Sequence, residues 1–555
     1  MRGRQVFMDS LVAHGVEAIF GNPGTTENPL LDSLIDYPQI PYYVALHEGV
    51  AVGAASFYAQ ATGKTGIVNL HVAPGLGNGI GMIYGALKAR SPMIVTAGQQ
   101  DTRLRLNEPL LSHDLVAMAA PVTKWSAEPR SADEIGPMMH RAFKIANDPP
   151  TGPVFIALPV DVMEQATEIA AVASTALRRE AAASEQGIAE VVDLLLRSAA
   201  PAIVVGDDVA RSGAVDLLVE FAELTGAPVW HEALRAQVSF PNRHPNNQGR
   251  IPFETANVHR TLAPHDVVVL IGGTFFEELW YDAGPIISEA TQVVQIEASH
   301  ERLAFSHRLD IGLVADLANA LTQLTKALSN KATDTFRAAA QARNDAFTKA
   351  RDEAREASNA RLQSLWDSDP MSPTRALYEI SQALPDDVVI VDESITASLE
   401  VGDQFDFSRP GDYYGGRGGG IGQAMAGVIG TKVAYPNRPV VALSGDGSTM
   451  YSIQALWSAA HHDLPILFII LSNREYRVLK HNLDIYRQRF NAQSNRPYPH
   501  MDLTKPVLGF VDMARGLGVE AAAVTDPSEL GGVISAALAS GKPYLIDVVI
   551  SGKPQ

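Results

Sequence analysis

Short apolar runs alternate with amphipathic stretches of helical length along most of the chain. In the first part, up to about Pro159, the apolar runs read EAIFG, YYVAL, TGIVNLH, PMIVTAG and PVFIALP. Strands that are apolar on both faces and alternate with helices are typical of βαβ units, in which helices cover both faces of a parallel sheet. The pattern therefore predicts an α/β fold built on doubly wound parallel sheets.

The same alternation returns twice, after polar and alanine-rich separators. The middle strands read PAIVVG, APVWH, VVVLIGG and QVVQIE, and the last part begins with VVIVDESIT. The separator over residues 164–186 suits a linker, and the alanine- and charge-rich run over 334–366 predicts a long exposed helix. We therefore predict three doubly wound domains, over residues 1–165, 186–330 and 369–555, with a helical linker over 331–368.

One βαβ unit of the last domain carries candidate chemistry. An apolar strand over 439–443 stops at Gly445-Asp446-Gly447, a helix is expected from about Ser452 to His462, and a second strand over 466–471 leads to Asn473. Parallel strand ends lie side by side, so Asp446 and Asn473 can meet at the carboxyl edge of the sheet. Carboxylate, amide and loop carbonyl oxygens suit Mg²⁺ that also holds a phosphate. Glycines and a helix start at Ser448 let backbone N–H groups approach that phosphate.

Composition narrows the class of protein. The 555 residues are 46% hydrophobic and 19% charged, which is ordinary for globular domains, and no window has the length of a membrane span. The first residues read as helix and strand rather than as a signal peptide, so we expect a soluble, cytoplasmic protein. The absence of cysteine excludes disulfides, thiolate metal sites and cysteine nucleophiles, and the net charge of −18 argues against nucleic-acid partners.

The GDG and Asn spacing, with Ser-x-x-Ala-Leu-Trp over Ser452 to Trp457, resembles the diphosphate-binding motif of thiamine diphosphate enzymes of the benzoylformate decarboxylase branch. The resemblance implies that Asp446, Asn473 and the main-chain carbonyl of Glu475 bind Mg²⁺. It also implies that the glycine-rich loop over 413–422 holds the cofactor, with the Gly419 carbonyl on its 4′-amine and Ile421 beneath its bent shape. The remaining cofactor contacts expected in this domain are Ser394, Ile395, Gly447, Ser448 and Tyr476.

Three predicted loops of the first domain resemble the pyrimidine-binding domain of the same family. They are GNPGTTE from Gly21, His47-Glu48-Gly49, and a glycine-rich loop from His71 to Asn78. By themselves they could be a tight turn, a first-turn helix acid favoured by the dipole and a structural histidine. The resemblance implies that Glu48 hydrogen-bonds N1′ of the aminopyrimidine and that His71 transfers protons. It places Pro23, Gly24 and Asn78 on the cofactor and Thr25 on the substrate. His113 is a second catalytic candidate, with a surface histidine as the equal alternative.

The predicted middle domain has glycines at two strand ends, Gly206-Asp207-Asp208 and Gly272-Gly273-Thr274. They could cradle an adenine nucleotide such as ADP, but no complete G-x-G-x-x-G is present. A scaffold domain is the favoured interpretation.

Two departures from the family pattern bear on the substrate. Benzoylformate decarboxylases use two active-site histidines; His71 matches one, whereas Leu279 occupies the position of the other within FFEELWY. Basic residues also accumulate after the metal loop, at Arg474, Arg477, Lys480, Arg487, Arg489 and Arg496, with only Glu475 and Asp484 opposing them. That run is either a solvated face or a site for a polyanion such as coenzyme A. The further substrate-binding candidates are Arg417, Leu479, Lys480, His481 and Gln493.

The sequence is therefore identified most closely with 2-hydroxyacyl-CoA lyases, relatives of oxalyl-CoA decarboxylases, which would release formyl-CoA and an aldehyde or ketone from an acyl-CoA. An aryl 2-oxo acid decarboxylase or carboligase is the alternative. A nucleotide-binding regulatory protein without catalysis is a third hypothesis, disfavoured because Glu48, Asp446 and Asn473 are all present. The resemblance also implies a homodimer as the minimum active unit and a homotetramer as the expected assembly.

Overall fold

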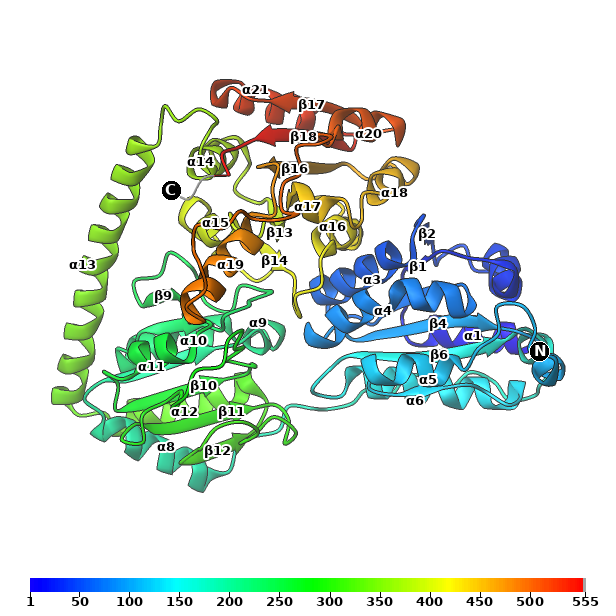
Figure 1. Cartoon of the computed structure of the whole chain (residues 1–555). Coiled ribbons are helices and arrows are strands. Elements are labelled where there is room, and N and C mark those ends of the chain that lie inside the picture. Colours follow the sequence, from blue (N-terminus) through cyan, green and yellow to red (C-terminus); the bar gives the residue numbers. More distant parts are fainter. Residues whose placement is uncertain (553–555) are drawn as a thin grey trace. The chain divides into compact units, whose positions relative to one another are not determined.

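The structure, a computed structural model, describes residues 1–552 and contains three six-stranded parallel sheets flanked by helices (Figure 1). The α/β architecture predicted from the alternating pattern is confirmed. Every strand pair with a printed register is parallel, as expected for strands joined by helical crossovers.

The first sheet has the strand order β2-β1-β3-β4-β6-β5. Its strands are β1 Ile19–Gly21, β2 Tyr42–Val44, β3 Gly66–Leu70, β4 Met93–Gln99, β5 Ser126–Ala127 and β6 Pro153–Pro159. The helices are α1 Gly3–Ala13, η1 Thr25–Glu27, α2 Asn28–Ser33, η2 Leu34–Asp36, α3 Glu48–Thr62, α4 Val72–Lys88, η3 Thr102–Asn107, α5 Leu115–Ala119, η4 Ala120–Val122, η5 Ala132–Glu134, α6 Ile135–Asn147 and α7 Val160–Glu164. Aliphatic side chains of β1, β3, β4 and β6 pack with α1 and α6 in one core.

The second sheet has the order β12-β11-β10-β7-β8-β9. Its strands are β7 Pro201–Val205, β8 Val229–His231, β9 Asn247–Arg250, β10 Val267–Ile271, β11 Gln292–Glu297 and β12 Ile311–Val314. The helices are α8 Glu185–Arg197, α9 Asp208–Arg211, α10 Val215–Thr225, α11 Thr255–Leu262, α12 Leu317–Lys331 and α13 Asp334–Ser364. A core lies on each face of this sheet, which explains why its strands are apolar throughout.

The third sheet has the order β14-β13-β15-β16-β18-β17. Its strands are β13 Val389–Glu393, β14 Tyr413–Gly415, β15 Val440–Gly445, β16 Ile466–Ser472, β17 Glu520–Val524 and β18 Tyr544–Val549. The helices are α14 Pro373–Ala383, α15 Ser398–Gln404, α16 Gln423–Ala434, α17 Asp446–Thr449, α18 Ala455–His461, α19 Arg477–Arg489, α20 Phe510–Gly516 and α21 Pro527–Ala539.

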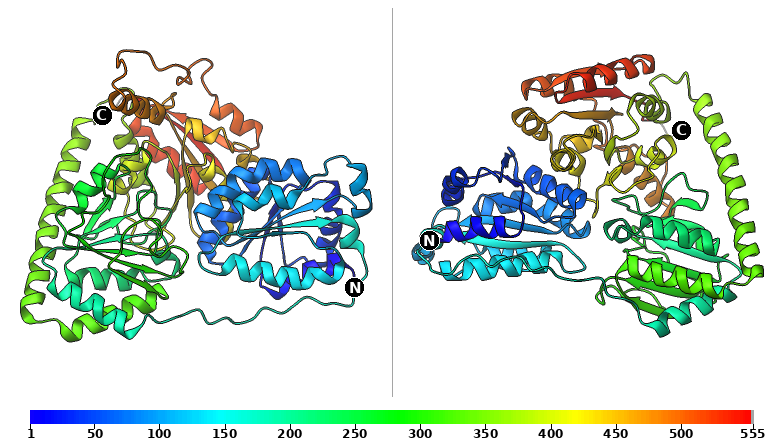
Figure 2. Two further views of the ribbon diagram at one scale, coloured as in Figure 1. Left: turned by 60° about the horizontal axis from the view of Figure 1, so that its bottom comes forward. Right: turned by 180° about the vertical axis from the view of Figure 1, so that it is seen from behind.

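The chain divides into two compact units. The first unit comprises Met1–Thr175, Leu365–Gln404 and the residues from Gly416 on, and the middle unit comprises Ala176–Ser364 with Phe405–Gly415. Residues 171–184, which carry no helix or strand, connect the first sheet to α8 (Figure 2). Within the first unit, α3 packs on α16 through small residues: a side chain at Gly53 would come within 2.5 Å of Ala426. This close approach connects the first and third sheets.

Two segments differ from the elements predicted for them. The expected glycine-rich loop from His71 to Asn78 is the start of α4, because Pro74 falls in the first turn, where its missing N–H breaks no helical bond. The helix expected from about Ser452 to His462 is observed as the shorter α18, and an additional short helix that was not expected, α17, begins at Asp446 itself.

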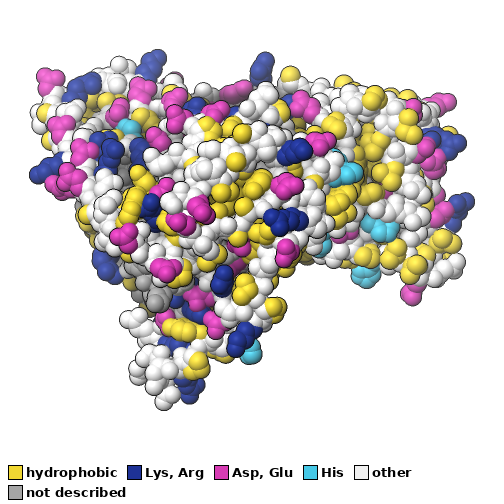
Figure 3. Space-filling view, turned by 90° about the horizontal axis from the view of Figure 1, so that it is seen from above, with side chains coloured by type: hydrophobic (Ala, Val, Ile, Leu, Met, Phe, Trp, Pro, Cys, Tyr) yellow, Lys and Arg dark blue, Asp and Glu magenta, His cyan; other side chains and the backbone are white. Residues whose placement is uncertain are grey.

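The surface mixes charges of both signs. On the face shown in Figure 3, Asp and Glu side chains are interspersed with Lys and Arg rather than gathered by sign. Over residues 1–552, no helix combines the length and the apolar character that crossing a membrane requires.

Candidate active site

Glu48 is the first residue of α3, four residues after the end of β2, and is only 6% exposed. The His47 imidazole caps the helix, with Nδ1 accepting from the Gly49 N–H at 3.0 Å. Two neutral amides hold the Glu48 carboxyl: Asn22 donates to Oε1 at 3.1 Å and Asn78 donates to Oε2 at 3.0 Å. A buried carboxyl held by neutral groups can share a proton with a basic ring nitrogen, which is the role expected for Glu48.

A second carboxyl, Glu27, holds His71 in place. His71 lies at the end of β3, and its Nδ1 is 2.8 Å from Oε2 of Glu27, which is buried. Backbone N–H groups of Gly24 and Gly98 donate to the two Glu27 oxygens, each at 2.8 Å, and so fix the carboxylate. Any side chain at Gly24 would overlap the His71 ring. With Nδ1 engaged, Nε2 is the nitrogen left to exchange a proton.

These two arrangements lie together at the carboxyl edge of the first sheet. A side chain at Gly75 would come within 3.0 Å of Glu48 Oε1 and 3.4 Å of His71 Cβ, so the two side chains flank the same turn of α4. Asn22, Glu48 and His71 follow β1, β2 and β3, which are neighbours in the sheet. The parallel topology thus brings three distant loops to one place.

The predicted metal residues meet at the ends of β15 and β16, which pair up to Gly445 and Leu471. Asp446 is 5% exposed; its Oδ1 accepts from the Gly447 N–H at 2.7 Å and its Oδ2 from the Arg474 N–H at 2.6 Å. The Asn473 side-chain oxygen accepts from the Glu475 N–H at 3.1 Å. Burial, helped by the nearby Asp547 carboxyl, raises the pKa of Asp446 to about 6 although the two backbone donors oppose that shift. A bound cation would compensate this desolvated charge.

The residues expected at the diphosphate surround the same loop. The Tyr476 ring lies over Gly447, where a side chain would meet it at 2.6 Å. A side chain at Gly445 would meet Ser448 Oγ at 3.9 Å and the Ser394 carbonyl at 4.0 Å. Ile395 follows with a left-handed backbone (φ 56°), as expected for a sharp turn between β13 and α15.

Two buried side chains fix the glycine-rich loop that carries Gly419 and Ile421. The Gln423 amide donates to the carbonyls of Arg417 and Gly420, each at 2.8 Å. Glu393 accepts from the N–H groups of Gly422 at 2.8 Å and Ala424 at 3.0 Å, at the start of α16. Burial raises the pKa of Glu393 to about 7 despite these donors.

The structure does not gather every predicted site residue. His113 is exposed, and its carbonyl accepts from the Gln99 amide at 2.9 Å and from the Leu115 N–H at 3.0 Å. Pro23 and Thr25 flank Gly24, whereas Arg417 is buried in the loop held by Gln423. Leu479 and His481 are exposed on α19, and Gln493 is exposed beyond the end of that helix. Leu279 is 61% exposed in the middle unit.

The basic run is more neutralised than the sequence suggests. Lys480 is buried and pairs with Glu475 and with Asp502. Asp502 lies beyond the acids, Glu475 and Asp484, that the sequence places against the basic run. Arg487 is buried too; it donates to the Pro497 carbonyl and lies over the Tyr498 ring. Both cations point inward, and the Lys480 ammonium is already paired with two carboxylates. The structure therefore does not support Lys480 as a phosphate ligand.

The glycine turns at the strand ends of the middle unit make internal contacts that disfavour ADP binding. Gly206 and Gly273 pack on each other. The buried Glu232 carboxylate accepts from the N–H groups of Asp207 at 2.9 Å and Thr274 at 2.9 Å. An internal anion already takes the donors that would have cradled a phosphate, and it would repel one.

The donor set of the first unit fits thiamine diphosphate with Mg²⁺. Asp446, Asn473 and the Glu475 carbonyl are hard oxygen donors of the kind that Mg²⁺ takes. Glu48 remains the residue predicted to hydrogen-bond the pyrimidine ring. No cluster of three or more His, Asp or Glu that could hold a metal occurs among residues 1–552, as expected for a site built from one carboxylate, one amide and one carbonyl.

Comparisons with known proteins agree with this geometry. Three thiamine pyrophosphate enzyme models match the chain: the N-terminal TPP binding domain at residues 1–118, the central domain at 188–324 and the C-terminal TPP binding domain at 396–548. Benzoylformate decarboxylase of Pseudomonas aeruginosa is 32% identical over 541 residues, covering 96% of each chain. The chain belongs to the thiamine diphosphate enzyme family.

Other members of the thiamine diphosphate enzyme family match this chain over nearly its whole length. A 4-hydroxybenzoylformate decarboxylase of Rhodococcus jostii superposes with a TM-score of 0.86 at 28% identity, covering 99% of both chains. The acetolactate synthase isozyme 3 large subunit of Escherichia coli is 25% identical over 567 residues, covering 100% of this chain and 95% of the relative. The protein is thus a thiamine diphosphate-dependent enzyme of the decarboxylase and acetolactate synthase type.

Proposed function

We propose that the protein decarboxylates an aromatic 2-oxo acid of the benzoylformate class. The observation that carries this proposal is the character of α19, the helix that follows the metal loop. Leu479, Tyr486 and Phe490 lie on one side of that helix and are 45%, 44% and 60% exposed, whereas Lys480 and Arg487 turn inward. An apolar face beside the metal loop suits an aryl group better than a coenzyme A phosphate.

The chain's own residues supply binding and proton transfer. Asp446, Asn473 and the Glu475 carbonyl would hold Mg²⁺ and through it the diphosphate, and Glu48 would anchor the pyrimidine ring. Thiamine diphosphate, when bound, supplies a nucleophilic carbon and accepts the electron pair released as the bond to the carboxylate breaks. The Glu27 carboxylate holds His71 Nδ1, so Nε2 can carry the proton that replaces CO₂ on the substrate carbon and yields an aldehyde.

A 2-hydroxyacyl-CoA lyase is the second candidate. It is favoured by the absence of a histidine between Phe275 and Tyr281, because a lyase need not share the two-histidine arrangement of benzoylformate decarboxylases. It would also use the exposed cations of the segment that starts at Arg474, whose backbone N–H donates to Asp446.

Turnover of the purified protein with thiamine diphosphate and Mg²⁺ separates the two candidates. Benzoylformate and 4-hydroxybenzoylformate are offered on one side and 2-hydroxyacyl-CoA thioesters on the other, with benzaldehydes and formyl-CoA as the products measured. Release of an aromatic aldehyde alone supports the decarboxylase. Formyl-CoA from a thioester, with both oxo acids untouched, overturns it in favour of the lyase.

We further propose that the active protein is at least a homodimer, which can be a pair within a homotetramer. The segment that carries η3 exposes two leucine side chains four residues apart, Leu106 at 97% and Leu110 at 81%, and exposed apolar surface of this kind can mark a contact with another protein chain. Replacing both by lysine should lower the mass measured by light scattering if this segment joins two copies; an unchanged mass would show that it does not.

A further inference from the structure

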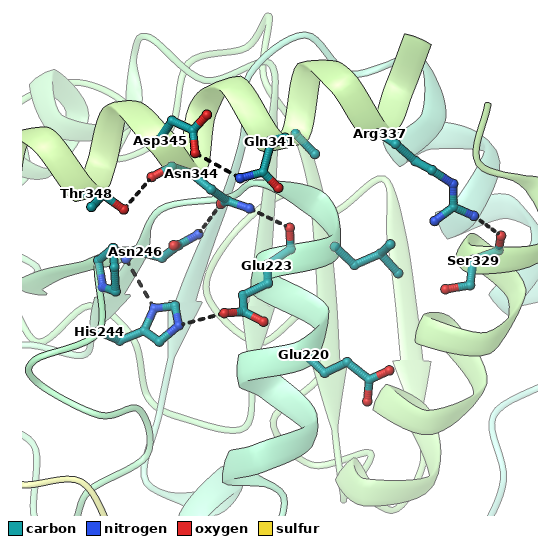
Figure 4. Close-up of a pocket in the computed structure, with 13 residues that line it drawn as sticks. Glu220, Glu223, His244, Asn246, Ser329, Arg337, Gln341, Asn344, Asp345 and Thr348 are labelled. Carbon is teal, nitrogen blue, oxygen red and sulfur yellow. Dashed lines mark hydrogen bonds and ion pairs between the residues drawn. The ribbon is translucent and has the colours of Figure 1, made fainter. Parts of the chain in front are cut away.

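The middle unit carries a pocket that the proposed reaction does not use. It has a volume of about 530 Å³ and lies between α10, the end of α12, the start of α13 and the loop before β9 (Figure 4). This volume is within the range of small-molecule sites. Its polar lining includes Glu220, Glu223, Asn246, Ser329, Arg337 and Asn344.

One wall of the pocket is held by its own hydrogen bonds. The Asn246 amide, which is buried, donates to the Asn344 side-chain oxygen at 2.9 Å, and Asn344 donates to the Glu223 carbonyl at 2.9 Å. His244 Nε2 lies 3.3 Å from the Glu223 carboxylate. These contacts tie α10, α13 and the loop before β9 together, so this wall needs no ligand to form.

The other end of the pocket carries two charged side chains, Arg337 and Glu220, for which residues 1–552 provide no ion pair. Arg337 donates from one terminal nitrogen to the Ser329 carbonyl at 2.6 Å, and its remaining N–H groups have no partner among residues 1–552. The Glu220 carboxylate likewise forms no hydrogen bond or ion pair with residues 1–552. Figure 4 shows both side chains at this end, projecting from α13 and α10. They are too far apart to pair with each other.

We propose that this pocket binds a small zwitterion, an α-amino acid, between Glu220 and Arg337. The ammonium group of the ligand would pair with the Glu220 carboxylate, and its carboxylate would take the free fork of the Arg337 guanidinium. Leu224 and Ala340 supply apolar surface of the same pocket for the carbon side chain. Because a ligand of this class carries an ammonium and a carboxylate on one carbon, it can contact both charges although they do not contact each other.

A ligand bound in this pocket would stabilise the start of α13. The 31-residue helix α13 buries only Phe336, Ala340 and Leu362. Its start is tied to α10 by Arg343, which donates to the carbonyls of Thr225 at 2.7 Å and Gly226 at 3.1 Å. A ligand that bridges Glu220 and Arg337 adds a second tie and stabilises the start of α13 against local opening.

Isothermal titration of the full-length protein with each common L-α-amino acid tests the proposal without reference to catalysis. At least one should bind, and its N-acetyl and methyl ester derivatives, each lacking one charge, should not. E220Q and R337Q should each weaken binding at least about tenfold, the loss of one charge-assisted hydrogen bond. The matched controls D216N and R355Q remove exposed charges of α10 and α13 outside the pocket and should leave affinity unchanged.

Hydrogen exchange of the same complex locates the ligand. Slower exchange is expected over residues 215–225 and 334–348, in wild type and in both controls. The proposal is overturned if no amino acid binds, if the uncharged derivatives bind equally well, or if binding survives both E220Q and R337Q.

Discussion

The pairing of Glu27 with His71 is the most informative contact between two side chains of the candidate site. Replacing Glu27 by glutamine removes the anion that fixes His71 Nδ1 while keeping the volume of the side chain. We expect kcat to fall by about 10²-fold or more with a smaller change in KM, because general acid–base catalysis contributes 10²–10⁴-fold.

A double-mutant comparison checks that Glu27 acts through His71. If Glu27 only positions the imidazole, the E27Q/H71A protein should be no slower than H71A. E17Q, which removes an exposed carboxylate paired with Lys64, is the matched control and should leave kcat unchanged. Multiplying losses in the double variant would show that Glu27 has a separate role.

Lys480 offers a second test at the scale of one residue, because its two candidate roles predict different outcomes. In the structure it neutralises Glu475 and Asp502, so K480M should cost about 1–2 kcal/mol of stability, reduced by the exposure of Asp502. It should not change the KM for any coenzyme A thioester relative to K505M, which removes an exposed lysine. Denaturant unfolding and thioester kinetics on the same two variants measure both effects.

At the scale of elements, the carboxyl end of β13 is joined to the start of α16 by one buried acid, Glu393. Its pKa is about 7 in the folded protein against 4.5 for a free side chain. Its contribution to stability is therefore complete below pH 4.5 and is lost as the pH rises to 7, because only the folded state holds the proton in that interval.

This raised pKa predicts how the first unit responds to pH. Wild-type protein should lose stability between pH 5 and pH 7.5 in part through Glu393, and E393Q should show a shallower loss. Urea unfolding midpoints at the two pH values, with E529Q at an exposed glutamate of the same unit as control, measure the difference. Parallel curves for wild type and E393Q would remove Glu393 as a source of the pH dependence.

The elements also show what the sequence could and could not predict. Strands were predictable because burial on both faces leaves an uninterrupted apolar run, as in β16. The start of α4 was not, because Pro74 and its neighbouring glycines read as a loop while the first turn of a helix tolerates proline. Asp446 and Asn473 were found because strand ends of a βαβ unit meet at a fixed edge.

The partners of those residues were harder to predict. Asn22 and Glu27 stand in the GNPGTTE turn, but their contacts with Glu48 and His71 depend on how three separate loops converge. The inward turn of Lys480 depends on Asp502, twenty-two residues further on. Neither contact leaves a periodic signal in the sequence, so only the fold shows that Lys480 is paired within the protein.

At the scale of the whole molecule, every residue expected on the cofactor belongs to the first unit and none to the middle unit. Thiamine diphosphate with Mg²⁺ should therefore stabilise the first unit, by about 2.7 kcal/mol at a hundred times Kd, and leave the middle unit unchanged. Hydrogen exchange with and without both ligands measures this: protection is expected around β3, β15 and β16 and not around β7 or β10. D446A should abolish the response, because the buried carboxylate is the charge that draws the cation into the site. Equal protection of β7 and β10, or a full response in D446A, would show that the cofactor does not depend on the residues assigned to it.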